Sequence, residues 1–238
     1  MTLQHTIQEQ EQADLREKSM VGGMGRDIFL FLLAAAAGFA LTAGVIRMLQ
    51  SADRGLPYRD RFVSSDNTEW SAYGGNWKVQ SGTMVNESNE RGAKLVAGSA
   101  YWQDYTVQAD VALRSLGDAG LLARVSDPEQ GVDAYSGIYV GLRIRDEALV
   151  LGVADHDWQE AVAKPLSSPI VPNSWYHLRV QLKGCNVNTI VTREDSTELA
   201  RLDRSLESCP LHGQIGLRSY DSGGMWKNVE VTKLGNPR

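Results

Sequence analysis

The sequence predicts an all-β protein, an antiparallel sandwich or barrel, preceded by a single transmembrane helix. One uncharged apolar run lies near the start of the chain, and many short stretches after residue 58 alternate apolar with polar residues. The 23 glycines, 6 tryptophans and 8 tyrosines among 238 residues also favour a turn-rich β protein. A formal net charge of −5, without a cluster of lysines and arginines, argues against a nucleic-acid partner, because binding to phosphates needs clustered basic side chains.

Residues 1–27 are predicted to form a polar arm. They carry three basic and five acidic side chains and are rich in glutamine and glutamate. Few apolar residues are present to anchor such a segment, and Gly22, Gly23 and Gly25 interrupt it near its end. We expect this arm to lie in the cytoplasm.

Residues 28–49 are predicted to cross the membrane as one helix. The run from Ile28 to Ile46 holds 19 residues without a charge and is bounded by Asp27 and Arg47. A helix needs about 20 apolar residues to cross the hydrocarbon core of a bilayer. A cleaved signal peptide is the alternative, but its apolar region is shorter, about 7–15 residues, and lies closer to the start of the chain.

The predicted helix carries small residues that suit close packing against a partner helix, and simple anchoring is the alternative. The candidate packing positions are Gly38, Thr42 and Gly44. Basic residues flank both ends of the helix, so the distribution of positive charge does not decide its orientation. Residues 50–57 are predicted to be a short linker, which holds the following domain close to the membrane.

The two cysteines of the chain, Cys185 and Cys209, both lie in the C-terminal part. A disulfide between them would indicate an oxidising compartment, whereas two reduced thiols are the alternative. On this basis we expect the N-terminus inside the cell and the C-terminal domain in the periplasm or at the cell exterior.

The strands of the C-terminal domain, residues 58–234, are predicted from the period of two in their apolar residues. The clearest runs are 106–114, 138–144 and 176–182, and Ser81-Gly82 is predicted to turn a hairpin between 77–80 and 83–85. Further strands are expected at 149–154, 187–191, 215–219 and 229–233, which makes about a dozen in all. Four tryptophans, Trp70, Trp77, Trp175 and Trp226, are predicted to pack in the core, and residues 235–238 are a short tail.

The order of tryptophan, glycine and apolar residues in this domain resembles the concanavalin A-like lectin and glucanase domains. The resemblance is carried by stretches such as GDAGLLARV (117–125), DAYSGIYVGL (133–142), WYHLRVQLKG (175–184) and GQIGLRSY (213–220). It is closest to the laminin-G-like branch of the 3-keto-disaccharide hydrolase type. The resemblance implies a jelly roll of two stacked antiparallel sheets, one of them concave.

Hydrolase activity is not expected, although the fold resembles glucanases. Glycoside hydrolysis commonly needs two carboxyl groups about 5–9.5 Å apart. The E-x-D-x-x-E pattern of the glucanase branch is absent from this sequence. Asp110 lies on a predicted strand but has no carboxylate partner at i±2 or i±4, and the acidic run 194–198 is predicted to be a hairpin turn.

No cofactor is expected, because the four histidines show no metal-binding spacing and no haem or iron–sulfur ligand set is present. The resemblance makes calcium possible near the last strand, but Lys227 precedes Asn228 where relatives often carry aspartate. This departure argues against a calcium site.

One set of side chains is a candidate ligand or partner face. Two tyrosines and an arginine fall on the strand that the resemblance places in the concave sheet, two further arginines follow Gly-Leu stretches, and one tryptophan lies in a loop expected at the rim. The candidates are Arg124, Tyr135, Tyr139, Arg143, Trp158 and Arg218. The alternative is that these arginines pair with nearby carboxylates and that Trp158 packs in the core.

The leading hypothesis is therefore a non-catalytic, membrane-anchored accessory subunit of a larger envelope-membrane complex, possibly bioenergetic, whose exported sandwich is a docking module. Its partners would be an integral membrane protein complex and the lipid bilayer. A membrane-tethered carbohydrate-binding domain is the alternative, and a glycoside-active enzyme is the third hypothesis. Paired carboxylates in the concave groove would favour the enzyme.

Overall fold

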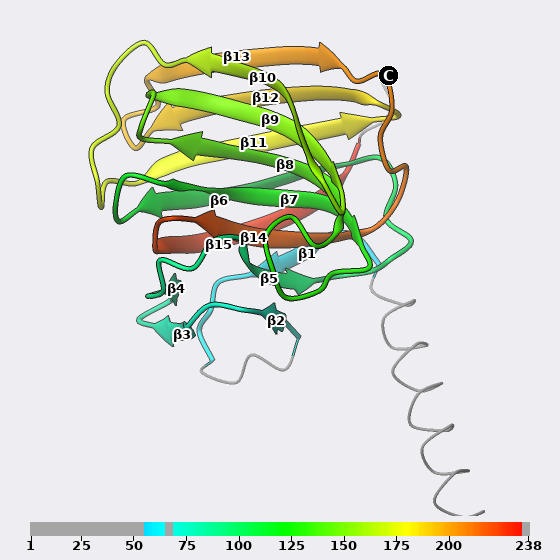
Figure 1. Cartoon of the computed structure of the whole chain (residues 1–238), viewed down its shortest axis with the longest axis horizontal. Coiled ribbons are helices and arrows are strands. Elements are labelled where there is room, and N and C mark those ends of the chain that lie inside the picture. The colour runs from blue at the N-terminus through cyan, green and yellow to red at the C-terminus, as the bar shows by residue number, and fades with distance from the viewer. Residues whose placement is uncertain (1–54, 65–68, 235–238) are drawn as a thin grey trace, which may run out of the picture. The chain divides into compact units, whose positions relative to one another are not determined.

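The computed structural model describes residues 55–64 and 69–234, which fold into two antiparallel β-sheets packed face to face (Figure 1). Fifteen strands and no helix occur among these residues, so the prediction of a two-sheet antiparallel sandwich is confirmed for this part of the chain. The strands are β1 (Tyr58–Asp60), β2 (Ser71–Tyr73), β3 (Trp77–Gln80), β4 (Thr83–Asn86), β5 (Ala93–Ala97), β6 (Tyr105–Leu113), β7 (Asp118–Ser126), β8 (Ser136–Arg143), β9 (Ala148–Asp155), β10 (Trp158–Pro165), β11 (Tyr176–Lys183), β12 (Asn186–Arg193), β13 (Glu198–Ser205), β14 (Gln214–Tyr220) and β15 (Gly224–Lys233).

One sheet has eight strands and the other has seven. The eight-stranded sheet follows the order β13-β12-β11-β6-β15-β4-β3, and β1 pairs with β15 beside this path. The seven-stranded sheet follows the order β10-β9-β8-β7-β14-β5-β2. Consecutive strands such as β7 to β10 form a meander, whereas β6 and β7 follow each other in sequence but belong to different sheets. Strands that are neighbours in sequence therefore contribute to both sheets, and neither sheet is formed by one continuous stretch of the chain.

The period of two in the sequence sets which side chains enter the core. Along β11, Tyr176, Leu178, Val180 and Leu182 are buried, and the residues between them are half-buried. Because successive side chains point to opposite faces of a strand, the buried set faces the other sheet. Alternate residues of β6, β7 and β8 also enter this core, although β7 and β8 are buried on both faces.

The predicted hairpin at residues 77–85 is confirmed. Gln80 pairs with Thr83, and Ser81 and Gly82 form the turn between them with φ values of 48° and 76°. A two-residue hairpin turn with both φ values positive matches the right-handed twist of the strands that it joins.

The tryptophan predictions are partly correct. Trp70 and Trp226 are buried in the core, and the half-buried Trp77 packs 5.3 Å from Trp226 between ring centroids. Trp175 was wrongly predicted as a core residue, because it is half-buried outside the core with the Lys227 ammonium 4.1 Å from its ring centroid. It directly precedes the buried Tyr176, and neighbouring side chains in extended chain point to opposite faces.

The predicted arm 1–27, the transmembrane helix 28–49 with Gly38, Thr42 and Gly44, the linker residues 50–54 and the tail 235–238 lie outside the described residues. Within 55–64 and 69–234 the structure has no helix long and apolar enough to span a bilayer.

Candidate functional site

The outer face of the seven-stranded sheet, the side turned away from the core, carries the candidate site. On β7 and β8 the core side is occupied by aliphatic residues such as Leu121 and Val140. The alternate positions face outward, and at the centre of the sheet they are Asp118, Gly120, Leu122, Tyr139, Gly141 and Arg143.

Glycines on adjacent strands hollow this outer face. Gly120 of β7 is the cross-strand partner of Gly141 of β8, and Gly152 of β9 is the partner of Tyr139. A Cβ atom at Gly141 would collide with the hydroxyl of Tyr139, and one at Gly152 would collide with the indole of Trp158. The glycines thus give two aromatic rings room to lie close to the sheet.

Arg218 of β14 is the centre of this hollow. Its Nη1 donates to Asp118 Oδ1 at 3.2 Å, and its Nη2 donates to Asp133 Oδ1 at 2.7 Å. Its guanidinium carbon lies 4.6 Å from the ring centroid of Tyr139, 5.9 Å from that of Trp158 and 5.5 Å from that of Tyr220. Two carboxylates and three aromatic rings therefore fix the orientation of this buried arginine.

Asp118 is a half-buried carboxyl group that binds two donors. Its Oδ1 accepts a hydrogen bond from the Tyr139 hydroxyl at 2.7 Å as well as from Arg218. Burial raises the pKa of Asp118 although Arg218 opposes the shift, and burial with the Asp118 charge raises the pKa of Tyr139 well above its ordinary value. Tyr139 therefore stays protonated and donates to this carboxylate.

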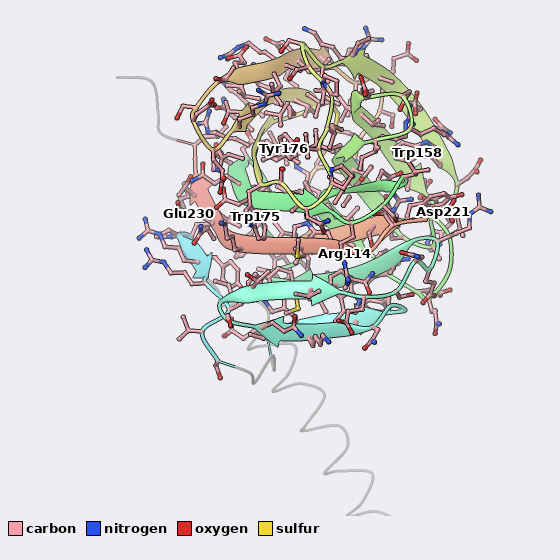
Figure 2. All side chains as sticks on the ribbon, turned by 90° about the vertical axis from the view of Figure 1, so that its left-hand side faces the viewer. Arg114, Trp158, Trp175, Tyr176, Asp221 and Glu230 are labelled. Carbon is pink, nitrogen blue, oxygen red and sulfur yellow. A yellow bond between two sulfur atoms is a disulfide. The ribbon has the colours of Figure 1, made fainter. Side chains whose placement is uncertain are left out.

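A cavity of about 340 Å³ opens above these residues. Its volume is at the lower end of the range for ligand pockets, about 300–1,000 Å³. Its lining comprises Leu116, Gly117, Asp118, Asp133, Tyr139, Arg143, Arg145, Val150, Trp158, Arg218, Tyr220 and Asp221. Figure 2 shows Trp158 and Asp221 on one side of the sandwich and Trp175 and Glu230 toward the other.

The loop 127–135 between β7 and β8 folds over the neighbouring part of the outer face. The buried ammonium of Lys94 donates to the carbonyl oxygens of Gly92 at 3.1 Å and Gly131 at 2.8 Å. Burial and the nearby Arg218 charge lower the pKa of Lys94 to about 8. Tyr135 of this loop packs in a second apolar cluster outside the main core, whose other members include Val96 and Leu122.

Arg143 belongs to an ion-pair group at the edge of the cavity. It binds Asp146 in a bidentate manner at 2.7 and 2.6 Å, and its Nη1 lies 2.7 Å from Glu160 Oε2. The hydrogen bonds to these carboxylates raise the pKa of Arg143 above its already high ordinary value. The prediction that such arginines pair with nearby carboxylates describes Arg143 and Arg218 correctly.

The structure brings four of the six candidate face residues together around the cavity: Tyr139, Arg143, Trp158 and Arg218. Tyr135 belongs to the loop 127–135 and is fully buried in the second apolar cluster. Trp158 is half-buried and its ring makes an edge contact with Tyr139 at 5.9 Å between centroids. It therefore packs beside the cavity and not in the main core.

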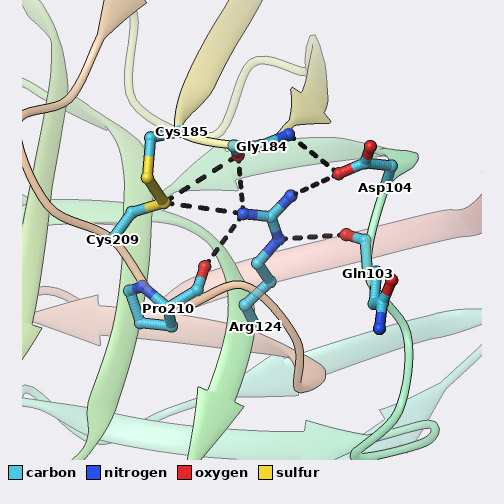
Figure 3. Close-up of a disulfide and its surroundings, with 7 residues drawn as sticks. All are labelled: Gln103, Asp104, Arg124, Gly184, Cys185, Cys209 and Pro210. Carbon is cyan, nitrogen blue, oxygen red and sulfur yellow. Dashed lines mark hydrogen bonds and ion pairs between the residues drawn. A yellow bond between two sulfur atoms is a disulfide. The ribbon is translucent and has the colours of Figure 1, made fainter.

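Arg124 was wrongly predicted as a face residue, because its side chain is fully buried at another place (Figure 3). It donates to the carbonyl oxygens of Gln103, Gly184 and Pro210 at 3.0, 2.7 and 2.9 Å, and it lies 3.0 Å from Asp104 Oδ1. The strand carries a register shift here and Arg124 has a φ of 52°, so its side chain leaves the alternation of β7.

The same region contains a disulfide between Cys185 and Cys209, whose Cα atoms are 5.7 Å apart. Arg124 Nη1 lies 3.6 Å from the Cys209 sulfur, so the disulfide and the arginine together fasten two loops to the end of β7 (Figure 3). The sequence left a disulfide and two reduced thiols as alternatives, and the structure contains the disulfide.

Sequence reasoning missed Asp118 and Asp133 as site residues. A search for carboxylates at i±2 or i±4 on one strand does not find them, because Asp118 begins β7 and Asp133 lies in the following loop. Asp110, the strand carboxylate that the sequence analysis considered and set aside, lies on the other sheet and binds His177 Nδ1 at 2.9 Å and Asn228 Nδ2 at 2.7 Å. Among the described residues no group of three metal-binding side chains occurs.

Comparison with known proteins shows a family match over residues 58–232, to the 3-keto-alpha-glucoside-1,2-lyase-like domain. The chain belongs to this family. No curated protein matches the chain in sequence. The carbohydrate-binding module CBM66 from Bacillus subtilis is similar in structure, with a TM-score of 0.57 and 18% identity over 69% of this chain and 96% of that one.

Two further structures share the fold of this 3-keto-alpha-glucoside-1,2-lyase-like domain. A Bacillus subtilis protein of unknown function with a galectin-like fold has a TM-score of 0.58 and 15% identity, over 75% of this chain and 96% of that one. The exoplasmic/lumenal domain of VIP36, bound to Ca²⁺ and Man3GlcNAc, has a TM-score of 0.56 and 14% identity, over 76% and 92%. At these identities the similarity establishes the fold alone.

The domain is thus a member of the 3-keto-alpha-glucoside-1,2-lyase-like family and shares the β-sandwich fold of these similar structures. This finding fits the predicted alternative, a carbohydrate-binding domain, better than the leading hypothesis of a membrane-complex subunit. The comparisons give no support to that subunit role.

Proposed function

We propose that the domain binds carbohydrate through the cavity on the outer face of the seven-stranded sheet. The observation that carries this proposal is the fixed Arg218, held by two carboxylates among three aromatic rings at the cavity. A sugar presents hydroxyl groups for hydrogen bonds and C–H faces for packing on aromatic rings. Ligand sites commonly combine apolar walls with a few well-placed polar groups, and this cavity has that composition.

The two carboxylates are well placed to accept hydrogen bonds from sugar hydroxyls. Asp118 and Asp133 each use Oδ1 to bind Arg218, and no described residue donates to the Oδ2 atom of either one. The acidic and basic side chains that line the cavity balance one another, with three aspartates and three arginines. A neutral, polyhydroxylated ligand matches this balance.

Trp158 is the aromatic side chain with which the proposal can be tested. It is half-buried, lines the cavity and packs against Tyr139. We expect Trp158→Ala to weaken sugar binding about tenfold, since an aromatic contact contributes about 1 kcal/mol beyond its buried area. The probes are methyl α-glucoside, a disaccharide that contains an α-glucoside, and the forms of both that are oxidised at C3.

Binding of these probes to the full chain is measured by titration calorimetry. Trp175→Ala is the matched control, because Trp175 is also half-buried but lies outside the cavity lining. Equal weakening by both substitutions, or no binding of any probe to the unmodified chain, would contradict the proposal.

A glycoside-cleaving activity is the second candidate, and the pairing of Asp118 with Asp133 on one arginine favours it. The family name implies a lyase that acts across C1 and C2 of a 3-keto-glucoside, with loss of the proton at C2 and of the substituent at C1. In this second candidate function, Asp118 or Asp133 would accept the C2 proton. We propose binding without cleavage, since the Oδ1 atom of each carboxylate is bound to Arg218 and only the Oδ2 atoms are left to accept hydrogen bonds from a ligand. Release of the C1 substituent from 3-keto probes by the unmodified chain, abolished in Asp133→Asn, would instead establish the lyase.

The localisation proposed for the domain follows from the sequence alone. The apolar run at residues 28–46 would anchor the chain in a membrane, with the carbohydrate-binding domain on the periplasmic or extracellular side. Extraction of native membranes with carbonate, followed by protease protection, tests the anchor and its orientation. A chain found in the soluble fraction would contradict both.

A further inference from the structure

The cavity is bounded on three sides by features of different kinds. The loop 127–135 bounds it where β7 ends and β8 begins, with Asp133 bound to Arg218. Trp158 bounds it on the side of β9 and β10, over Gly152. Tyr220 bounds it on the side of β14, where the Arg91 guanidinium lies 4.8 Å above its ring.

The fourth side has a different character. It is the edge where β7 begins and β8 ends, because Asp118 pairs with Arg143. Leu116 and Arg145 are exposed cavity-lining side chains at this edge, and Asp221, whose backbone adjoins Gly117, is a third. Leu116 is 73% exposed, which makes it one of the most exposed large apolar side chains among the described residues.

The backbone around Leu116 is held firmly, so this leucine does not belong to a loose loop tip. The Ser115 backbone donates to Ser222 Oγ at 3.2 Å, and Ile144 donates to the Gly117 carbonyl at 3.1 Å. A Cβ atom at Gly117 would collide with the backbone carbonyl of Tyr220, so the chain there is in close contact with β14. This arrangement keeps an apolar side chain at the rim of a cavity whose floor is polar.

We propose that the cavity receives the terminal sugar of a glycoside and that an apolar aglycone lies against Leu116. This inference rests on the proposed carbohydrate-binding function and specifies its ligand class. Because the other three sides are bounded, the substituent of the bound sugar extends out of the cavity at the Leu116 edge. An aryl group on that path covers the exposed leucine, and removal of apolar surface from water favours binding.

The experiment compares phenyl α-glucoside with methyl α-glucoside, and phenol alone serves as the control for non-specific binding of the aryl group. We expect the full chain to bind the phenyl glycoside about tenfold more tightly than the methyl glycoside in calorimetric titration. In Leu116→Ser this preference should fall to about twofold.

Leu211→Ser is the matched control, because Leu211 is also exposed, at 58%, and does not line the cavity. This variant should keep the full preference. Equal affinities for the two glycosides, or a preference that survives in Leu116→Ser, would overturn the inference while the carbohydrate-binding function stands. Failure of both glycosides to bind would overturn the function and the inference together.

Discussion

Two arginines that follow similar glycine–leucine stretches occupy entirely different environments. Arg218 comes directly after Gly216-Leu217 and keeps the alternation of β14, so it faces outward over the sheet. Arg124 follows GLLA (120–123) and stands at a register shift with a positive φ, so it turns toward the loops at residues 184 and 210. A single irregular residue in a strand therefore decides which of two similar motifs reaches the candidate site.

Lys94 is the residue whose titration can be measured as a change in stability. Its pKa is lowered from 10.5 to about 8 by burial and by the Arg218 charge. A group with a depressed pKa contributes stability that is present above its unfolded pKa and is lost as the pH falls through its folded pKa. The unfolding free energy of the unmodified chain should therefore rise between about pH 8 and 10, relative to Lys94→Met.

The full shift of Lys94 corresponds to roughly 3 kcal/mol, of which most should be visible by pH 10. Urea titrations of both proteins at half-unit pH steps measure the difference. A difference in unfolding free energy that stays constant from pH 7 to pH 10 would show that Lys94 titrates normally in the folded protein.

At the scale of elements, the loop 127–135 depends on a close backbone contact with Gly92. This glycine has a φ of 79°, and a Cβ atom there would lie 3.0 Å from both the Gly131 carbonyl oxygen and the Val132 Cα. The loop carries Asp133, which binds Arg218 at the cavity. A side chain at position 92 should therefore affect both stability and binding.

We expect Gly92→Ala to lower the unfolding free energy by about 2 kcal/mol, from the strained φ and the loop contact, and to weaken sugar binding severalfold. Gly184→Ala is the control, since Gly184 has a φ of 52° but nothing lies within 4 Å of its Cβ position. The Gly184→Ala variant should lower the unfolding free energy by about 1 kcal/mol and leave the sugar affinity unchanged. Chemical denaturation measures the change in unfolding free energy, and calorimetry measures the change in sugar affinity. Equal changes in both variants would contradict a role for the contact between Gly92 and the loop.

The elements also show why the sheets were easier to predict than the site. The strands with strict alternation, such as 176–183, match their predicted ranges because one face must be buried. The pairing of Asp118, Asp133 and Arg218 joins β7, the loop after it and β14, which are up to 100 residues apart in sequence. No local pattern records such a contact.

At the scale of the whole molecule, the disulfide closes a loop between residues 24 positions apart and fastens it beside Arg124. Replacement of both cysteines by serine should lower the unfolding free energy by about 3 kcal/mol, because the unfolded chain regains the freedom that the cross-link removes. Sugar binding should be unchanged, since neither cysteine lines the cavity. Thermal and urea denaturation of the variant, with a binding titration on the same sample, measure both quantities.

The all-β character of the domain, most of its strands and the family resemblance can be read from the amino-acid order, because burial of one sheet face imposes a period of two that is visible residue by residue. Tyr139 and Arg218 of the outer face were likewise predicted from the sequence as candidate face residues. Only the tertiary structure decided that Arg124 is buried beside a disulfide and that Asp118 and Asp133 converge on Arg218. Convergence depends on how strands are ordered in the sheet and where a bulge or loop turns the chain, and these are properties of the packed molecule as a whole.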